Sequence, residues 1–71
     1  MKERTLYLRP WREFRFLTQA ELAAKAEVSR DTVAKIEAGN QTPRIPTVRK
    51  LAVALETQPV NLYRLPAEDG D

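Results

Sequence analysis

The chain has 71 residues, which is enough for one domain and no more. A domain of this size buries only about 60% of the surface that its unfolded chain exposes, so its core must be closely packed. Cysteine and histidine are both absent, which excludes disulfide bonds, thiolate or imidazole metal ligands and the most common general base. No apolar run follows Lys2 and Arg4, so we expect neither a signal peptide nor a membrane span, but a cytoplasmic protein.

The net charge of +2 conceals an uneven distribution along the chain. All twelve Lys and Arg residues lie between Lys2 and Arg64, whereas three of the last four residues are acidic. Residues 1–65 carry twelve positive and seven negative charges, a net charge of +5. Such an excess attracts polyanions, although an ordinary solvated surface explains it equally well.

Caps and prolines divide the chain into short helices. Residues 1–9 are expected to form a basic arm that is either extended or leads into a helix. Pro10 suits the first turn of a helix, where its missing N–H would have no partner, so a first helix is predicted over residues 10–16.

The second and third helices have the clearest start signals. Thr18-Gln19-Ala20-Glu21 has the form of a capping box, in which Thr18 is the N-cap and Glu21 reaches back to it. Strong helix formers follow up to residue 26. Ser29 is a second N-cap, and a third helix is predicted over residues 29–38 with Gly39 as its C-terminal stop.

Two shorter helices are predicted after a polar loop. Pro46 opens a helix over residues 46–55, and Pro59 opens a last one that Pro66 ends. Residues 66–71 are expected to be an acidic, disordered tail. The sequence thus predicts an all-α domain of five short helices over residues 10–65. Its second and third helices form a helix-turn-helix over residues 18–38, because a turn of three or four residues joins them.

The spacing of apolar residues supports that unit. Small or apolar side chains recur one turn apart in both helices, and one more fills the corner of the turn. A plain helical hairpin with an ordinary core is the alternative, but the combination of two caps, a small residue and paired apolar residues favours the helix-turn-helix. The residues concerned are Leu22, Ala23, Ala26, Val28, Val33 and Ile36.

Several stretches resemble the phage-repressor-like helix-turn-helix family, also called the Xre family. They are residues 17–23 (LTQAELA), 28–29 (VS), 36–39 (IEAG), 43 (P) and 51–55 (LAVAL), within a resemblance that extends from about Leu8 to Leu65. The resemblance implies a compact lambda-repressor-like fold that binds double-stranded DNA. The family usually has glycine where this chain has Phe16, Glu27 and Glu56. A non-glycine residue at positive φ costs about 1 kcal/mol, so we expect these turns to be slightly strained or reshaped.

The third helix offers a face for reading bases. Val33 and Ile36 point inward, which places the outward face, around Asp31 and Lys35, where it can enter a major groove. Arg30 or Lys35 can donate to guanine, Asp31 can accept from cytosine, and Ala34 can contact a thymine methyl group. A weak surface ion pair is the alternative for Asp31 and Lys35, and Ser29 is equally a cap or a DNA contact. The candidate DNA-binding residues are Gln19, Ser29, Arg30, Asp31, Thr32, Ala34, Lys35, Asn40, Thr42 and Arg44.

Phosphate contacts are expected at the edges of this face. Gln19 lies at the N-terminus of the second helix, where unpaired N–H groups and the helix dipole attract anions. The family resemblance implies further contacts from Asn40, Thr42 and Arg44 in the loop after the third helix.

Glu37 requires a partner within the protein. It lies four residues beyond Val33, so its carboxylate faces the protein body, where an unpaired charge is costly. The resemblance implies that Arg12 in the first helix is this partner. We therefore expect an Arg12–Glu37 ion pair with a structural role.

The aromatic residues indicate a core anchor and two alternative surfaces. Trp11 is expected in the core. Phe14 and Phe16, with Leu6 and Tyr7, are expected to form a satellite cluster or a self-association surface, since solitary domains of the family commonly act as dimers. The alternative dimer surface, which we favour, comprises Val60, Leu62 and Tyr63.

The leading functional hypothesis is a sequence-specific transcriptional regulator, a repressor that binds as a homodimer to half-sites about one helical turn apart. The alternative is a protein-interaction module, such as an antitoxin or regulatory subunit with a toxin as partner and secondary DNA binding. Ser29, Asp31 and Lys35 can be imagined as a nucleophilic site, but a cap and a DNA-facing surface account for them. No enzyme activity, catalytic residue, metal or cofactor is expected.

Overall fold

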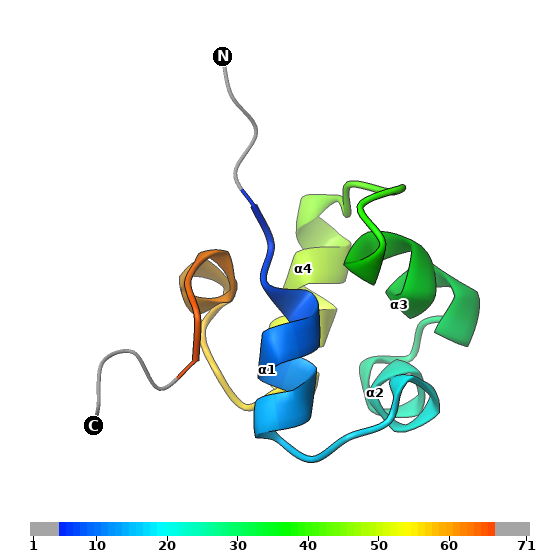
Figure 1. Ribbon diagram of the computed structural model, residues 1–71, viewed down its shortest axis with the longest axis horizontal. Coiled ribbons are helices and arrows are strands. Elements are labelled where there is room, and N and C mark those ends of the chain that lie inside the picture. Colours follow the sequence, from blue (N-terminus) through cyan, green and yellow to red (C-terminus); the bar gives the residue numbers. More distant parts are fainter. Residues whose placement is uncertain (1–4, 67–71) are drawn as a thin grey trace.

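The computed structural model describes residues 5–66, which form four α-helices and one short 3-10 helix (Figure 1). The helices are α1 (Leu8–Phe14), α2 (Gln19–Ala26), α3 (Arg30–Glu37) and α4 (Ile45–Ala54), followed by the 3-10 helix η1 (Pro59–Tyr63). No strand occurs in this part of the chain. The all-α prediction is confirmed, but the expected fifth α-helix is wrong. Only five residues lie between Gln58 and Arg64, too few for more than a tight 3-10 turn.

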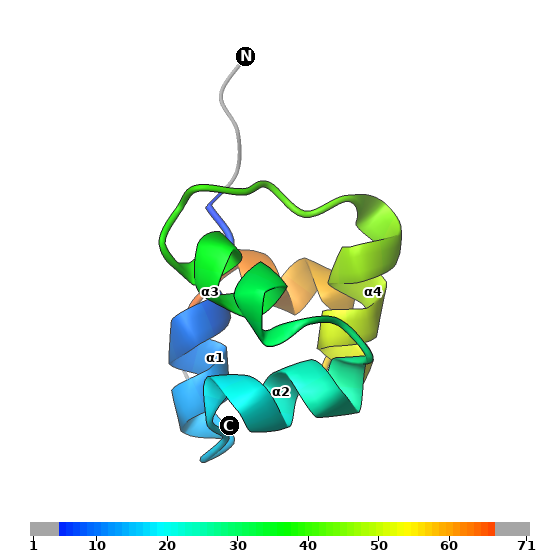
Figure 2. The ribbon, with the colours of Figure 1, turned by 90° about the vertical axis from the view of Figure 1, so that its right-hand side faces the viewer.

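The helices form a compact bundle in which α3 lies on one side and η1 on the other (Figure 1). Seen from the side of α3, that helix lies in front, above α2, and the loop after it crosses to the start of α4 (Figure 2). The most extensive helix contacts join α2 to α3 and α2 to α4. The rest of the bundle therefore packs against one side of α3 and leaves the opposite side of this helix uncovered.

α1 begins two residues earlier than predicted, so residues 8 and 9 belong to the helix and not to an arm. Leu8 is buried in the core, and the N–H of Tyr7 donates to the carbonyl of Leu62 at 2.8 Å, which holds the start of the helix. Pro10 is then the third residue of α1 and is equally tolerated there, because none of the first four N–H groups of a helix has an intrahelical partner. Residues 1–4 of the expected arm and 67–71 of the expected tail lie outside the described residues.

One apolar core joins all five elements. Trp11 is buried, as expected, and its indole N–H donates to the carbonyls of Asn61 and Arg64 at 3.0 and 2.9 Å, which ties α1 to the end of η1. The buried side chains belong to Leu8, Trp11, Leu22, Ala23, Ala26, Val33, Ile36, Val48, Leu51, Ala52, Ala54, Leu55 and Leu62.

Two of the apolar surfaces considered from the sequence differ in the structure. Leu62 is fully buried, so the C-terminal surface favoured for dimerisation retains only Val60 as a strongly exposed apolar residue among its three members. The satellite cluster does not include Phe16, which is 93% exposed, whereas Leu6 and Tyr7 pack against the core. Leu62 is buried because η1 packs against α4. Phe16 is exposed because it lies in the turn that ends α1, at a positive φ.

The four α-helices share one C-terminal geometry. Each is followed by a residue at positive φ, namely Phe16 at 59°, Glu27 at 60°, Gly39 at 81° and Glu56 at 59°. In each case that residue and the next donate back to carbonyls three and five residues earlier, for example Glu27 to Ala24 and Val28 to Ala23. This is the Schellman pattern, which glycine usually completes. The turns are therefore not reshaped, and three of them adopt the left-handed conformation with a full side chain.

Candidate nucleic-acid interface

Two side-chain caps define the helix-turn-helix. The Thr18 hydroxyl accepts from the N–H of Glu21 at 3.0 Å, and the Glu21 carboxylate accepts from the N–H of Thr18 at 2.8 Å, so the capping box is complete. The Ser29 hydroxyl accepts from the N–H of Thr32 at 3.0 Å and starts α3. Between them, Glu27 in the left-handed conformation ends α2 and turns the chain toward α3. These local interactions fix the angle at which α3 leaves α2.

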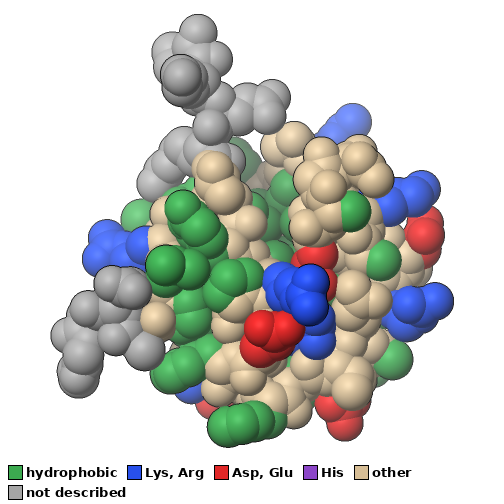
Figure 3. All heavy atoms as spheres, in the orientation of Figure 1, with side chains coloured by type: hydrophobic (Ala, Val, Ile, Leu, Met, Phe, Trp, Pro, Cys, Tyr) green, Lys and Arg blue, Asp and Glu red, His purple; other side chains and the backbone are tan. Residues whose placement is uncertain are grey.

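α3 has an inward apolar side and an outward polar side. Val33 and Ile36 are buried against the core, whereas Arg30, Asp31 and Lys35 are exposed. Charged side chains of both signs project from the edge of the molecule on which α3 lies (Figure 3). The outward side is thus a ridge of charged and small residues, the kind of surface that fits the width of a major groove.

Asp31 and Lys35 form the ion pair that was the alternative to base contact. Their carboxylate oxygen and ammonium nitrogen lie 3.1 Å apart, one turn apart on the exposed side of α3. Ser29 makes the cap contact, and its hydroxyl also lies 2.8 Å from that of Thr32, which is half-buried. DNA contacts of these four residues remain predictions.

The remaining candidates border α3 on two sides. Asn40, Thr42 and Arg44 are exposed in the loop from α3 to α4, and Arg44 is the residue before α4 begins. The loop is held at its start by the N–H of Asn40, which donates to the carbonyl of Lys35 at 2.9 Å. Gln19 is the first residue of α2. The structure thus brings all ten candidates to α3 and its immediate neighbours, with Ala34 half-buried between them.

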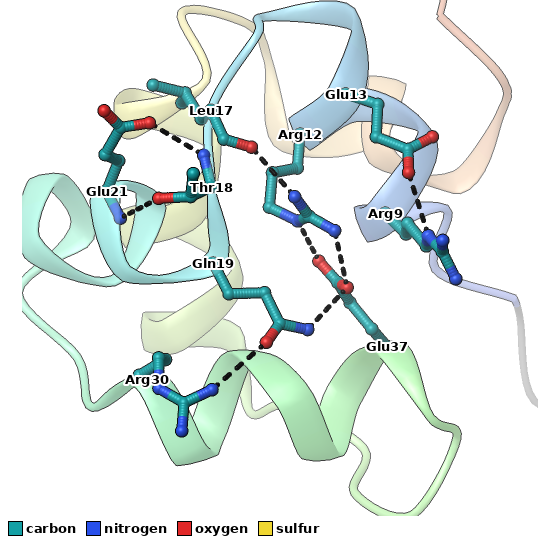
Figure 4. A network of polar contacts seen from close by, with 9 residues as sticks. All are labelled: Arg9, Arg12, Glu13, Leu17, Thr18, Gln19, Glu21, Arg30 and Glu37. Atoms are coloured by element: carbon teal, nitrogen blue, oxygen red, sulfur yellow. Dashed lines mark hydrogen bonds and ion pairs between the residues drawn. The ribbon is translucent and has the colours of Figure 1, made fainter.

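Behind this surface, Arg12 and Glu37 form a bidentate ion pair between α1 and α3 (Figure 4). The Arg12 Nε and Nη2 donate to the two Glu37 carboxylate oxygens at 2.6 and 3.2 Å, and Nη1 donates to the carbonyl of Leu17 at 2.8 Å. The two side chains are only 12% and 6% exposed. The hydrogen bond to Glu37 raises the pKa of Arg12, and its effect outweighs the opposing effect of burial. The guanidinium therefore stays charged.

Gln19 extends the Arg12–Glu37 ion pair toward the surface, a role that was not predicted from the sequence. Its side-chain Nε2 donates to Glu37 Oε1 at 3.0 Å, and its Oε1 lies 3.4 Å from Nη1 of Arg30 (Figure 4). The signal was present in the sequence, because Gln19 lies four and seven residues before the buried Ala23 and Ala26 and so shares their inward face. Gln19 was expected to contact only phosphate, because it is polar and lies next to the N-cap of α2.

The fold and this surface define the chain as a helix-turn-helix domain. A model of the helix-turn-helix domain family matches residues 5–65. The chain therefore belongs to that family, and it is of the phage-repressor-like (Xre) type, a group of DNA-binding regulators, as its sequence motifs indicated. No match to this chain was found among curated proteins.

Solved structures of similar fold include DNA-binding regulators. The restriction-modification controller protein C.AhdI from Aeromonas hydrophila is 32% identical over 79% of this chain and 85% of that chain, with a TM-score of 0.77. The DNA-binding domain of the P22 C2 repressor is 25% identical over 79% and 74% of the two chains, with a TM-score of 0.76. The hypothetical transcription factor NHTF from Neisseria is 25% identical over 89% and 72%, with a TM-score of 0.78.

Proposed function

We propose that this domain binds duplex DNA sequence-specifically as a small transcriptional regulator, with α3 in the major groove. The observation that carries the proposal is the outward side of α3, where Arg30, Asp31 and Lys35 are exposed while the opposite side is buried. The N-terminal residues of such a helix reach base edges when the helix enters the groove. The Arg12–Glu37 pair supports α3 from the protein side and would keep its orientation fixed on DNA.

The two regions that border α3 are suited to contact phosphates. Gln19 is the first residue of α2, and the positive end of the helix dipole at such an N-terminus attracts phosphate oxygens. Asn40, Thr42 and Arg44 offer an amide, a hydroxyl and a guanidinium on the other side. Contacts of this kind set the position of the protein on the duplex, and base contacts then select the sequence.

We further propose that the domain acts as a repressor and binds as a homodimer to two half-sites. Among its structural relatives, the P22 C2 protein is a repressor and C.AhdI is a controller of restriction and modification. A regulator that covers promoter DNA represses by exclusion, and two copies double the number of bases that are read. The domain itself has only one α3, so near-palindromic sites require a second copy.

A protein-interaction module is the second candidate function, and one observation favours it. Phe16 is 93% exposed and Phe14 43% exposed at the end of α1, and large exposed apolar side chains are typical of surfaces that bind another protein. A toxin or another regulatory partner would bind there while DNA binding was secondary. Substitution of Phe16→Ser would then abolish partner binding and leave duplex binding unchanged.

The test is a gel-shift assay on random duplex over a series of salt concentrations. If a dimer neutralises roughly six phosphates, log K falls with log salt with a slope of about −5. Arg44→Ala should reduce the magnitude of the slope by about one per protomer, because it removes a cation from the proposed phosphate-contacting loop, whereas Arg64→Ala should leave the slope unchanged. The control residue Arg64 directly follows η1, which lies on the other side of the molecule from α3 (Figure 1). A slope near zero would exclude the proposal.

A further inference from the structure

We propose that a basic groove between α2 and α4 binds the acidic segment 68–71 of a second copy of this chain. The inference rests on the homodimer of the proposed function and deepens it, because it names a contact by which the two copies join. None of the ten candidate DNA-binding residues lines this groove, so the contact is separate from the proposed DNA interface.

The groove lies where the last turn of α2 meets α4. In Figure 2 the end of α2 lies beside α4, to the right of α3. The volume of the groove is about 330 Å³. Its lining includes Ala26, which is buried, and Val53, whose side chain is 77% exposed although it is apolar. The lining residues are Lys25, Ala26, Glu27, Arg49, Lys50 and Val53.

The three cations of the groove have no acidic partner in the described part of the chain. Lys25, Arg49 and Lys50 are exposed, and among residues 5–66 no carboxylate lies within ion-pair distance of them. The three ion pairs found in residues 5–66 lie elsewhere, within α1, between α1 and α3 and within α3. Glu27 adds one negative charge, so the lining carries a net charge of +2. Such a concentration of uncompensated cations attracts an anionic partner.

The acidic segment of this chain has the complementary charge. Glu68, Asp69 and Asp71 carry three negative charges, and no basic residue lies between them. Leu65, which is 41% exposed, precedes them by only three residues. One peptide can therefore offer carboxylates to the cations and an apolar side chain to Val53. A phosphate backbone would meet the cations alone, so the exposed isopropyl group favours a peptide over a nucleic acid.

The segment that fits the groove comes from a second copy. In Figure 1, η1 lies toward one end of the longest axis of the molecule and α2 toward the other. The domain measures 32 Å along that axis. The five residues from 67 to 71 span at most about 17 Å when fully extended, about half of that length. A segment that leaves the chain after η1 therefore does not reach its own groove, whereas two copies can exchange their segments symmetrically.

The test measures self-association of the full chain without DNA, by sedimentation equilibrium. Lys25→Glu/Arg49→Glu and Glu68→Lys/Asp69→Lys should each weaken dimerisation about tenfold or more, because like charges then meet. A variant with all four substitutions should recover most of the loss, since opposite charges meet again. Arg9→Glu, a charge reversal on an exposed residue of α1 outside the groove, should change dimerisation less than about twofold. Raising the salt concentration from about 0.05 to 0.5 M should weaken the wild-type dimer.

Recovery in the fourfold variant distinguishes the contact from damage to the fold, because further substitutions would not repair a misfolded chain. If the free wild-type chain is a monomer, the same variants are compared by the ratio of their affinities for duplexes with two half-sites and with one. This ratio cancels the effect of each substitution on the binding of a single copy to DNA.

Three outcomes would overturn the proposal. If all variants dimerise as the wild type does, the homodimer stands but its copies join elsewhere. If Lys25→Glu/Arg49→Glu weakens the binding of one copy to one half-site and leaves dimerisation unchanged, the groove binds DNA. If the wild-type chain forms no dimer with or without DNA, the proposed homodimer fails as well. Gel shifts with a single half-site test the proposed DNA binding separately from each of these results.

Discussion

Arg12 and Glu37 are two charged side chains that the fold has largely removed from water. Removing ions from water is costly, and a buried pair is stabilising only when its geometry is good and its remaining donors are satisfied. Here both carboxylate oxygens are held, and the Arg12 guanidinium also donates to the Leu17 carbonyl. The main effect of the pair is to fix α3 relative to α1, because any other arrangement leaves a buried charge without a partner.

Replacement of Glu37 by alanine should therefore destabilise the domain far more than its loss of contacts suggests. It leaves the Arg12 guanidinium buried and unpaired and also removes the acceptor of the Gln19 amide. We expect a loss of about 3 kcal/mol in the free energy of unfolding, and a fall in Tm of roughly 12 °C or more. Chemical and thermal denaturation measure both quantities.

Glu13→Ala is the matched control for that substitution. Glu13 pairs with Arg9 at 2.9 Å, but both side chains are mostly exposed, at 56% and 67%. An exposed pair of this kind contributes at most about 0.5 kcal/mol. Equal losses for the two variants would show that the Arg12–Glu37 pair does not hold α1 and α3 together. The pKa of Arg12 is raised in the folded state by its hydrogen bond to Glu37, so the contribution of the Arg12 charge is lost as the pH rises through that raised pKa.

Phe16, Glu27 and Glu56 hold backbone strain at the ends of three helices. The left-handed conformation costs a residue with a side chain about 1–2 kcal/mol. Glycine relieves that cost but loses more conformational freedom when the chain folds. We expect Glu27→Gly to raise the free energy of unfolding by about 0.5–1 kcal/mol, as the difference of these effects.

Glu27→Ala separates the backbone effect from the side-chain effect. It removes the same carboxylate but keeps a Cβ atom at a φ of 60°, so the strain remains. Denaturation curves should show stabilisation for glycine and none for alanine. If both substitutions stabilise the domain equally, the charge of Glu27 and not its backbone conformation is the cause.

At the scale of single helices, side-chain caps distinguish α2 and α3 from the other two α-helices. α2 and α3 have only eight residues each, too short to be stable in isolation. Both start with a side-chain cap, whereas α1 and α4 have none and depend on proline and packing instead. The helix pair that forms the proposed interface is therefore the pair with the strongest local start signals.

Thr18→Ala should cost about 1 kcal/mol of stability, since it removes the acceptor for the Glu21 N–H and breaks the capping box. Thr18→Ser keeps the hydroxyl and should restore most of the loss. The free energy of unfolding from urea titration measures both variants. An alanine variant as stable as the wild type would mean that the α2 N-terminus is held by tertiary contacts alone.

Local signals account for what the sequence could predict. Caps, prolines and apolar spacing predicted α2 and α3 to within a residue or two, and helix phase predicted that Glu37 faces inward. The start of α1 could not be predicted, because it depends on the hydrogen bond from Tyr7 to Leu62, far along the chain. The same holds for Arg15, which donates to the carbonyls of Leu55 and Glu56 at the end of α4. Such contacts join residues whose separation in sequence gives no local pattern.

At the scale of the molecule, charge and shape are organised around α3. The helix pair presents charged side chains on one side (Figure 3), while the exposed aromatic ring of Phe16 lies on the loop between α1 and α2. Among residues 5–66, no helix is long and apolar enough to cross a membrane. The described domain is 32 × 30 × 19 Å in extent, so one copy covers about nine base pairs of duplex at about 3.4 Å per base pair. Two copies on the same side of the duplex therefore have room side by side when their centres are about one helical turn apart.

This width leads to a prediction for the spacing of half-sites if two copies bind together. Two bodies 30 Å wide fit side by side with their centres one turn apart, about 34–36 Å or 10 base pairs. An insertion of 5 base pairs moves the second half-site to the opposite side of the duplex, so the copies can no longer touch. It should weaken binding of the second copy by about tenfold or more. An insertion of 10 base pairs restores the side but separates the copies, so binding of the second copy should be equally weak.

Gel shifts resolve the one-copy and two-copy complexes, and a single half-site gives the affinity of one copy alone. The same second-step affinity at every spacing would show that the copies bind independently, in which case the domain reads each half-site as a monomer.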